Sequence, residues 1–194
     1  MIELRALKKS FEDSILLDDV NYQIRQGEGH LWKGHNGCGK TTLSRILCGL
    51  EAFDSGELLK PSEISLMLVQ QDFVIWPQLT VKKNLTLAAP PSQWSSIAKE
   101  LSLTELLQKK AGILSYGQKQ RLCLARALAT NPDLLILDEA VSHLDQKQLE
   151  TVRESIKKRL SKGMACIWIT HRPEEVLPLQ PKIWQFQEQS LREK

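Results

Sequence analysis

Cysteine is scarce in this sequence, and its spacing excludes the common cysteine-based sites. The four cysteines stand at positions 38, 48, 123 and 166, with no Cys-x-x-Cys pair and no spacing typical of a zinc site. Cys48, Cys123 and Cys166 lie among apolar residues, which favours small core side chains over reactive or ligating ones. We therefore expect a reduced, cytosolic compartment.

Long apolar runs are also absent. No stretch approaches the roughly 18 apolar residues that a membrane-spanning helix needs. The N-terminal stretch MIELRALKKSF alternates like a strand and lacks the apolar segment of a signal peptide. If this protein acts at a membrane, we expect another chain to cross it.

An excess of charge of one sign is missing too. Lysine and arginine number 26 and the acidic residues 23, which gives a net charge of +3 with the two signs interspersed. Charge alone therefore gives no reason to expect a nucleic-acid partner. A chain of 194 residues with 42% hydrophobic composition is long enough for one domain with its own core.

Apolar residues follow two periodicities along the chain. Alternation at Ile2, Leu4 and Ala6, and again over residues 20–24, predicts half-buried strands. The segments 64–69, 134–139 and 165–171 are apolar runs, and continuous runs are typical of parallel strands buried on both faces. Helical spacing predicts amphipathic helices at two sets of residues: Leu43, Ile46, Leu47 and Leu50, and then Leu149, Val152, Ile156 and Leu160. This alternation of strands and helices predicts an α/β fold.

Residues 73–113 differ from the rest in composition. They hold Pro77, Pro90 and Pro91, a polar loop, and helical patterns around 94–101 and 104–109. We expect a largely helical insertion here.

The segment from Gly34 to Thr41 satisfies the pattern G-x-x-x-x-G-K-[ST] between an expected strand and an expected helix. Its glycines let backbone N–H groups curl around a β-phosphate, Lys40 would reach the β- and γ-phosphate oxygens, and Thr41 would ligate Mg²⁺. The N-terminus of the following helix adds a positive dipole end. Thr42 would add a hydroxyl near the α-phosphate.

Two acids end the apolar run LLILDE, where the carboxyl ends of parallel strands place ligands. Asp138 would hold the hydration shell of the metal ion, and Glu139 would take a proton from an attacking water. General bases of this kind contribute about 10²–10⁴-fold to rates. These residues predict binding and hydrolysis of a nucleoside triphosphate, and a small-molecule kinase would also fit them.

The stretch LSYGQ, residues 114–118, begins another helix. Ser115 and Gln118 have the spacing of a capping box, in which each side chain bonds the other residue's backbone N–H. Gly117 lies in the first turn, where glycine is unfavourable by roughly 0.5–1 kcal/mol relative to alanine. A helix N-terminus is an anion site, so this glycine raises the question of which anion it faces.

Taken in order, Gly34–Thr41, LSYGQ, Leu137-Asp138-Glu139 and His171 resemble the ATP-binding subunit of ABC transporters over nearly the whole chain. The resemblance implies a P-loop NTPase core with a mostly parallel sheet, an N-terminal antiparallel β subdomain and a helical subdomain. We expect residues 1–194 to form a single ATPase domain, with residues 72–114 as the helical insertion between the Q-loop and the signature motif.

The resemblance also assigns roles to individual residues. Gln71, rather than Gln70, matches the Q-loop glutamine, and His171 matches the switch histidine. Phe11 matches the aromatic residue that stacks on adenine, although it fits an ordinary core residue as well. Asp145 of SHLD matches the D-loop and also fits a helix N-cap.

The predicted ATP-binding residues are Phe11, Gly34, His35, Asn36, Gly37, Cys38, Gly39, Lys40, Thr41, Thr42 and Gln71. The predicted catalytic residues are Lys40, Glu139 and His171, and the predicted metal-binding residues are Thr41, Gln71 and Asp138. Leu114, Ser115, Tyr116, Gly117 and Gln118 form the signature motif, which the family uses on an ATP held by a second subunit.

The family packs two such subunits head to tail, with ATP and Mg²⁺ between them. The resemblance therefore implies an active ATPase at the inner face of the cell membrane. It would power transport by a separate membrane subunit, whose coupling helix the region 73–113 would receive. The stretch VIWPQLTVKKNLTL is similar to small-solute importers, whereas the short chain resembles the haem-export ATPase, so the direction of transport stays open.

Four positions depart from the family pattern. Tyr116 replaces the first signature glycine, and Ala140 and His143 are unusual in LDEAVSHLD. Lys33 stands where an apolar residue is usual. The chain ends 23 residues after His171, counted as 194 minus 171, which disfavours relatives with added regulatory domains. An alternative function is a soluble ATPase of the same type that remodels or regulates a protein partner.

Overall fold

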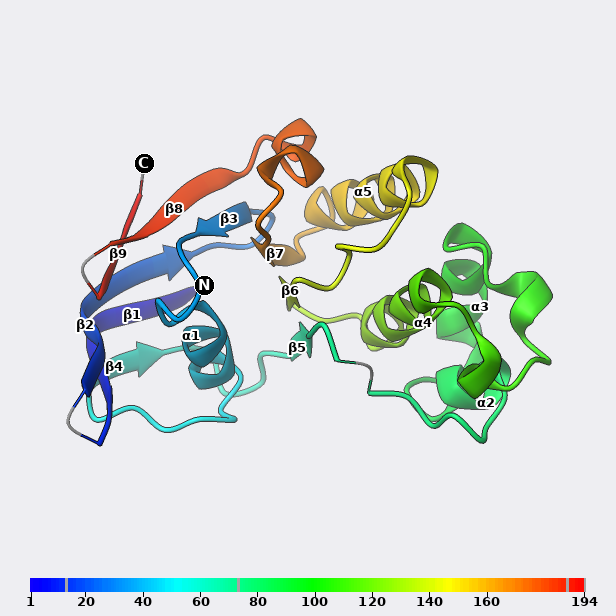
Figure 1. Ribbon diagram of the computed structural model, residues 1–194, viewed down its shortest axis with the longest axis horizontal. Coiled ribbons are helices and arrows are strands. Elements are labelled where there is room, and N and C mark those ends of the chain that lie inside the picture. Colours follow the sequence, from blue (N-terminus) through cyan, green and yellow to red (C-terminus); the bar gives the residue numbers. More distant parts are fainter. Residues whose placement is uncertain (13, 73, 188, 194) are drawn as a thin grey trace.

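The computed structural model describes residues 1–12, 14–72, 74–187 and 189–193. Figure 1 shows two β-sheets at one end of the molecule and a group of helices at the other. The strands are β1 (Ile2–Phe11), β2 (Ser14–Ile24), β3 (Gly29–Lys33), β4 (Ser55–Leu59), β5 (Leu66–Val69), β6 (Leu134–Asp138), β7 (Ala165–Ile169), β8 (Lys182–Gln187) and β9 (Ser190–Glu193). The α-helices are α1 (Lys40–Leu47), α2 (Val81–Thr86), α3 (Pro91–Glu100), α4 (Tyr116–Ala129) and α5 (Gln146–Leu160).

The larger sheet has the order β5-β6-β7-β3-β8-β9. Its strands are parallel from β5 to β8, and β9 returns antiparallel to β8. The smaller sheet, β2-β1-β4, is antiparallel. This arrangement confirms the predicted α/β class with its N-terminal antiparallel part.

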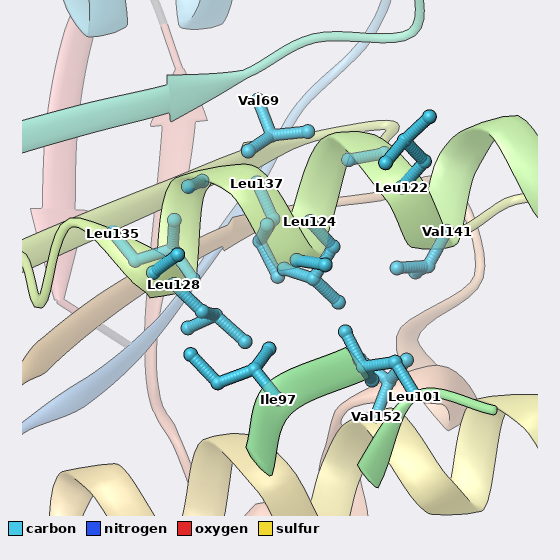
Figure 2. Packing of buried hydrophobic residues seen from close by; sticks show 14 of the residues in the cluster. Val69, Ile97, Leu101, Leu122, Leu124, Leu128, Leu135, Leu137, Val141 and Val152 are labelled. Atoms are coloured by element: carbon cyan, nitrogen blue, oxygen red, sulfur yellow. The ribbon is translucent and has the colours of Figure 1, made fainter. Parts of the chain in front are cut away.

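Both faces of the larger sheet are buried, as the continuous apolar runs predict. Along β6, Leu134 and Ile136 belong to a core shared with α1 and the antiparallel sheet. Leu135 and Leu137 point the other way, into a core shared with α4 and α5. Figure 2 shows this second core, where side chains of β6 pack against those of α4 and α3.

The helical insertion is only partly as predicted. Helix α3 matches the pattern around 94–101, but the helix expected around 104–109 is a single 3-10 turn, Thr104–Leu106. The carbonyl groups of Leu107 and Lys109 accept hydrogen bonds from the N–H groups of Lys82 and Val81 at 2.9 Å each. These carbonyl groups satisfy free N–H groups at the N-terminus of α2, so they are not used in a helix over 104–109. Helix α2 itself was not predicted from the sequence.

Two expected core positions are wrong. Ala6 is exposed and has a φ of 45°, because a register shift between Leu4 and Leu7 brings Leu7 into the core instead. Leu50 is 60% exposed, because α1 ends at Leu47 and Gly49 then turns the chain with a φ of 72°.

Asn84 on α2 fixes the loop that leads into the insertion. It is fully buried, and its side chain accepts a hydrogen bond from Trp76 N at 2.9 Å and donates to the carbonyls of Trp76 and Thr80 at 3.0 Å. One amide thus satisfies several backbone groups of residues 76–80. The apolar periodicity does not reveal such a residue, because it is polar and buried.

We predict that Asn84→Ala lowers the free energy of unfolding by about 1–3 kcal/mol, because it leaves buried backbone groups without partners. Urea denaturation measures the change. Lys82→Ala, on the exposed face of the same helix, is the matched control and should change stability by less than about 0.5 kcal/mol. Equal stability of the two variants would contradict this role for Asn84.

Candidate functional site

The candidate site is a groove at the carboxyl ends of β3, β6 and β7. Parallel pairing sets Trp32 beside Ile169, and Asp138 beside the same Ile169, so the loops that follow these strands emerge together. The groove has a volume of about 560 Å³. Its lining residues are Leu16, Asn36, Gly37, Gly39, Lys40, Thr41, Thr42, Gln71, Asp138, Glu139, Ser142, His143, His171 and Arg172.

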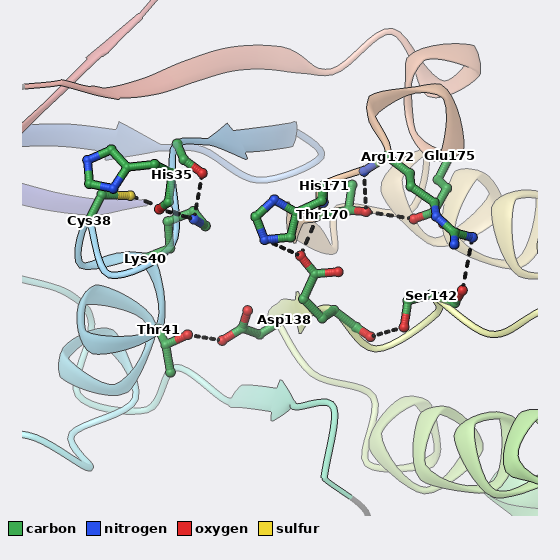
Figure 3. A network of polar contacts seen from close by, with 12 residues as sticks. His35, Cys38, Lys40, Thr41, Asp138, Ser142, Thr170, His171, Arg172 and Glu175 are labelled. Carbon is green, nitrogen blue, oxygen red and sulfur yellow. Dashed lines mark hydrogen bonds and ion pairs between the residues drawn. The ribbon is translucent and has the colours of Figure 1, made fainter.

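The glycine loop between β3 and α1 has the backbone that a phosphate cradle requires. Gly37 and Gly39 have φ values of 79° and 100°. A Cβ at position 39 would lie 2.6 Å from Leu17 Cδ2, so only glycine fits there. Lys40 Nζ donates to the carbonyls of Gly34 and His35 at 2.8 and 2.9 Å. The ammonium group is therefore held at the loop (Figure 3).

Thr41 and Asp138 meet across the groove, although they are 97 positions apart. Thr41 Oγ1 donates to Asp138 Oδ2 at 2.6 Å (Figure 3). Burial raises the pKa of Asp138, and this hydrogen bond and Lys40 partly offset the effect. The two oxygens are hard ligands of the kind that Mg²⁺ prefers, and Gln71 lines the same groove.

Glu139 is held against His171. Glu139 Oε1 accepts a hydrogen bond from the backbone N–H of His171 at 3.1 Å and lies 3.4 Å from its Nε2. Burial raises the pKa of Glu139, and His171 partly offsets the effect. Glu139 also has a φ of 54°, an uncommon conformation for a residue other than glycine. Its carboxyl is therefore fixed in place and shifted towards accepting a proton.

The structure adds groove residues that were not among the predicted site residues. Ser142 Oγ donates to the carbonyl of Glu139 at 3.1 Å, and Arg172 donates to the carbonyl of Ser142 at 3.1 Å. The only feature of the sequence that points to Arg172 is its position directly after His171. Leu16 had no signal, because it reaches the groove from β2 of the other sheet.

Several predicted residues lie outside the groove lining. Gly34, His35 and Cys38 belong to the loop but do not line the groove. Phe11 is 47% exposed beneath Lys9, whose Nζ is 4.5 Å from the ring centroid, so its alternative as an ordinary core residue is wrong. Asp145 accepts a hydrogen bond from Gln148 N at 2.8 Å, which confirms it as the N-cap of α5.

The signature residues 114–118 are also absent from the lining of this groove in the part of the chain that the structure describes. The predicted capping box is confirmed: Ser115 N donates to Gln118 Oε1 at 3.0 Å, and Gln118 N to Ser115 Oγ at 3.4 Å. Leu114 is buried and Tyr116 is 39% exposed. The N-terminus of α4 is thus well formed, but it does not face the glycine loop of its own chain.

Comparison with known proteins supports the resemblance. The family model described as ABC transporter matches residues 17–142. Maltose/maltodextrin import ATP-binding protein MalK from Yersinia pestis bv. Antiqua (strain Antiqua) is 34% identical over 205 residues, covering 94% of this chain and 54% of the relative. The same protein from Yersinia pseudotuberculosis serotype I (strain IP32953) has the same identity and coverage. The chain therefore spans about half the length of these curated relatives.

Solved structures agree on the fold. A nucleotide-free ATP-binding cassette from an ABC transporter has a TM-score of 0.87 at 22% identity, covering 100% of this chain and 90% of that one. An ATP-binding subunit of an ABC transporter has a TM-score of 0.91 at 20% identity, with 100% and 89% covered. No helix among the described residues is long and apolar enough to cross a membrane.

The raised pKa of Asp138 makes a testable statement about stability. When a carboxyl has a higher pKa in the folded than in the unfolded state, the protein becomes less stable as pH rises from the unfolded-state pKa through the folded-state pKa. We therefore predict that Asp138→Asn raises the thermal midpoint of the nucleotide-free protein at pH 7. The gain should vanish at a pH low enough to protonate Asp138.

Thermal unfolding across pH measures this difference, with the exposed Glu63→Gln as a matched carboxyl-to-amide control. A less stable Asn variant at pH 7 would mean that the contact of Asp138 with Thr41 outweighs the burial of its charge.

Proposed function

This chain belongs to the ABC transporter family, and from that premise we propose that it binds and hydrolyses ATP to power transport by a separate membrane subunit. The carrying observation is the convergence of Lys40, the Thr41–Asp138 pair and the Glu139–His171 pair in one groove. We take residues 1–194 as one ATPase domain, with residues 72–114 as its helical insertion.

Each groove residue has a role that its position suits. The N–H groups of the glycine loop and the first turn of α1 would bind the phosphates, and Lys40 would exchange its loop carbonyls for phosphate oxygens. Glu139 would accept the proton of the attacking water, for which its raised pKa is suited. His171 would hold Glu139 in position and contact the γ-phosphate. Outside the groove lining, the exposed ring of Phe11 would stack on adenine.

The oxygen donors at the groove also fit Mg²⁺. Thr41, Asp138 and Gln71 would hold the ion, with Asp138 binding through its hydration shell. When bound, Mg²⁺ would neutralise charge on the phosphates. The described residues contain no cluster of three or more His, Cys, Asp or Glu side chains that could hold a metal alone. Such a cluster is unnecessary where phosphate oxygens complete the shell.

The signature motif, residues 114–118, would serve a second copy of the chain. In a head-to-tail pair, Ser115 and the backbone at Gly117 would face the γ-phosphate held by the partner's glycine loop. ATP would then join the two copies, and hydrolysis would loosen them. The absence of the motif from the groove of its own chain supports this arrangement.

A second groove suits the membrane subunit. It has a volume of about 380 Å³ and lies where β5, α2 and α4 meet, with Leu68, Leu87 and Cys123 among its lining residues. Val74 and Leu87 are 70% and 58% exposed at its edge. An apolar groove of this kind fits an amphipathic helix, and we propose that it receives the partner's coupling helix at the inner face of the cell membrane.

The soluble remodelling ATPase is the weaker alternative. The curated relatives are named as import ATP-binding proteins, and the exposed apolar groove suits a helix of a membrane subunit.

We predict that Glu139→Gln lowers ATP turnover by about 10²–10⁴-fold while ATP binding persists, because the variant keeps the shape of the side chain but loses the base. The same variant should form an ATP-promoted dimer. Phosphate release and sedimentation measure the two effects. The matched control is Glu63→Gln, the same change of side chain at an exposed position outside the groove.

Turnover that is unchanged in Glu139→Gln would remove Glu139 as the base. Loss of ATP binding in this variant would instead show that the carboxylate serves the nucleotide rather than the water.

We further predict that Leu87→Asp reduces recovery of a multi-span partner from native membranes by about tenfold or more, because docking would bury an unpaired charge. Mild-detergent affinity purification with mass identification measures the recovery. Leu59→Asp, which changes an exposed leucine of β4, is the matched control. Equal recovery with both variants would exclude this groove as the docking site.

A further inference from the structure

Two aromatic side chains connect α4 to the loop that follows the catalytic acids. Tyr116 is the first residue of α4, and His143 lies between β6 and α5. Their ring centroids are 4.2 Å apart, with 51° between the ring planes. The two rings are therefore in direct contact.

The backbone beneath this pair is also closely packed. A Cβ at position 117 would lie 3.2 Å from Gln148 Oε1 and 3.4 Å from the carbonyl oxygen of His143. The first turn of α4 therefore packs directly on residues 143–148.

A chain of hydrogen bonds continues from His143 to the backbone carbonyl of Glu139. Ser142 Oγ lies 2.9 Å from His143 Nδ1 and donates to the carbonyl of Glu139 at 3.1 Å. A hydroxyl has one proton to donate, and Ser142 donates it to the backbone carbonyl of Glu139. In the contact between Ser142 and His143 the proton therefore lies on Nδ1, which donates to Oγ. The carbonyl of Ser142 in turn accepts from Arg172, the neighbour of His171 (Figure 3).

We propose that Tyr116 and His143 are positioning residues that couple the N-terminus of α4 to Glu139 within one subunit. The inference rests on the proposed function, in which α4 meets an ATP held by a second copy. The ring contact makes the loop 142–145 move with α4, so closure on the partner's ATP orders Glu139 and His171 at the subunit's own ATP. His143 also lines the groove and Tyr116 does not, and the proposal gives neither side chain a direct role at the reacting atoms.

The test is a double-mutant cycle on steady-state hydrolysis of Mg²⁺-ATP. Tyr116→Ala and His143→Ala should each lower kcat by about 3–10-fold, while KM changes by less than about twofold. The double variant should be no slower than the slower single variant, because the two side chains act as a unit. Tyr116→Phe keeps the ring and should recover most of the kcat that the alanine variant loses.

A purely structural role would give a different result. It would lower the thermal midpoint and multiply the two losses in the double variant, and Tyr116→Phe would bring no recovery. Multiplied losses, or a change confined to KM, would overturn the proposal even where Glu139→Gln confirms the ATPase activity.

Hydrogen exchange separates this proposal from the proposed function, because it needs no turnover. Backbone exchange over residues 141–145 should be faster in Tyr116→Ala than in the wild-type chain. The double variant should exchange no faster than Tyr116→Ala. A wild-type chain without ATPase activity would refute the proposed function alone. Unchanged exchange in Tyr116→Ala would refute the coupling, whatever the activity.

Discussion

The parallel register of β3, β7 and β6 is the constraint on which the rest of the structure depends. It brings Trp32 and Asp138 to the same neighbour, Ile169, so three loops far apart in sequence end at one groove. The register is in turn held by burial on both faces, because alternate residues of β6 point into two different cores. A one-residue slip of β6 would reverse its faces and move both acids away from the glycine loop.

Most of the fold and of the groove could be predicted from sequence, because local chemistry determined them. The glycine loop, the capping box of Ser115 and the N-cap of Asp145 use contacts between residues close in sequence. The apolar runs of β6 and β7 are typical of buried strands of a parallel sheet. The remaining features depend on contacts between distant segments. Ala6 lies at a register shift, Asn84 binds a loop from within α2, and Leu16 enters the groove from the other sheet.

Two of the departures from the family pattern lie side by side in the structure. Tyr116 and His143 pack on each other, and a hydrogen-bond chain links this pair to Glu139. Gly117 belongs to the same contact region, where the first turn of α4 lies close to Gln148. The signature turn therefore has two surfaces. One packs on the loop after β6, and the other is the surface that we propose faces a second copy. Nothing in the structure gives a physical reason for Lys33.

The central claim is that the ATP site is completed by the signature motif of a second copy. Ser115→Asp in the Glu139→Gln background tests it most directly, because aspartate keeps the N-cap but adds a negative charge opposite the γ-phosphate. Titration calorimetry would give the ATP affinity, and sedimentation the dimer. We expect unchanged ATP affinity of the monomer and loss of the ATP-promoted dimer. A persisting dimer, or weaker ATP binding by the monomer, would contradict it.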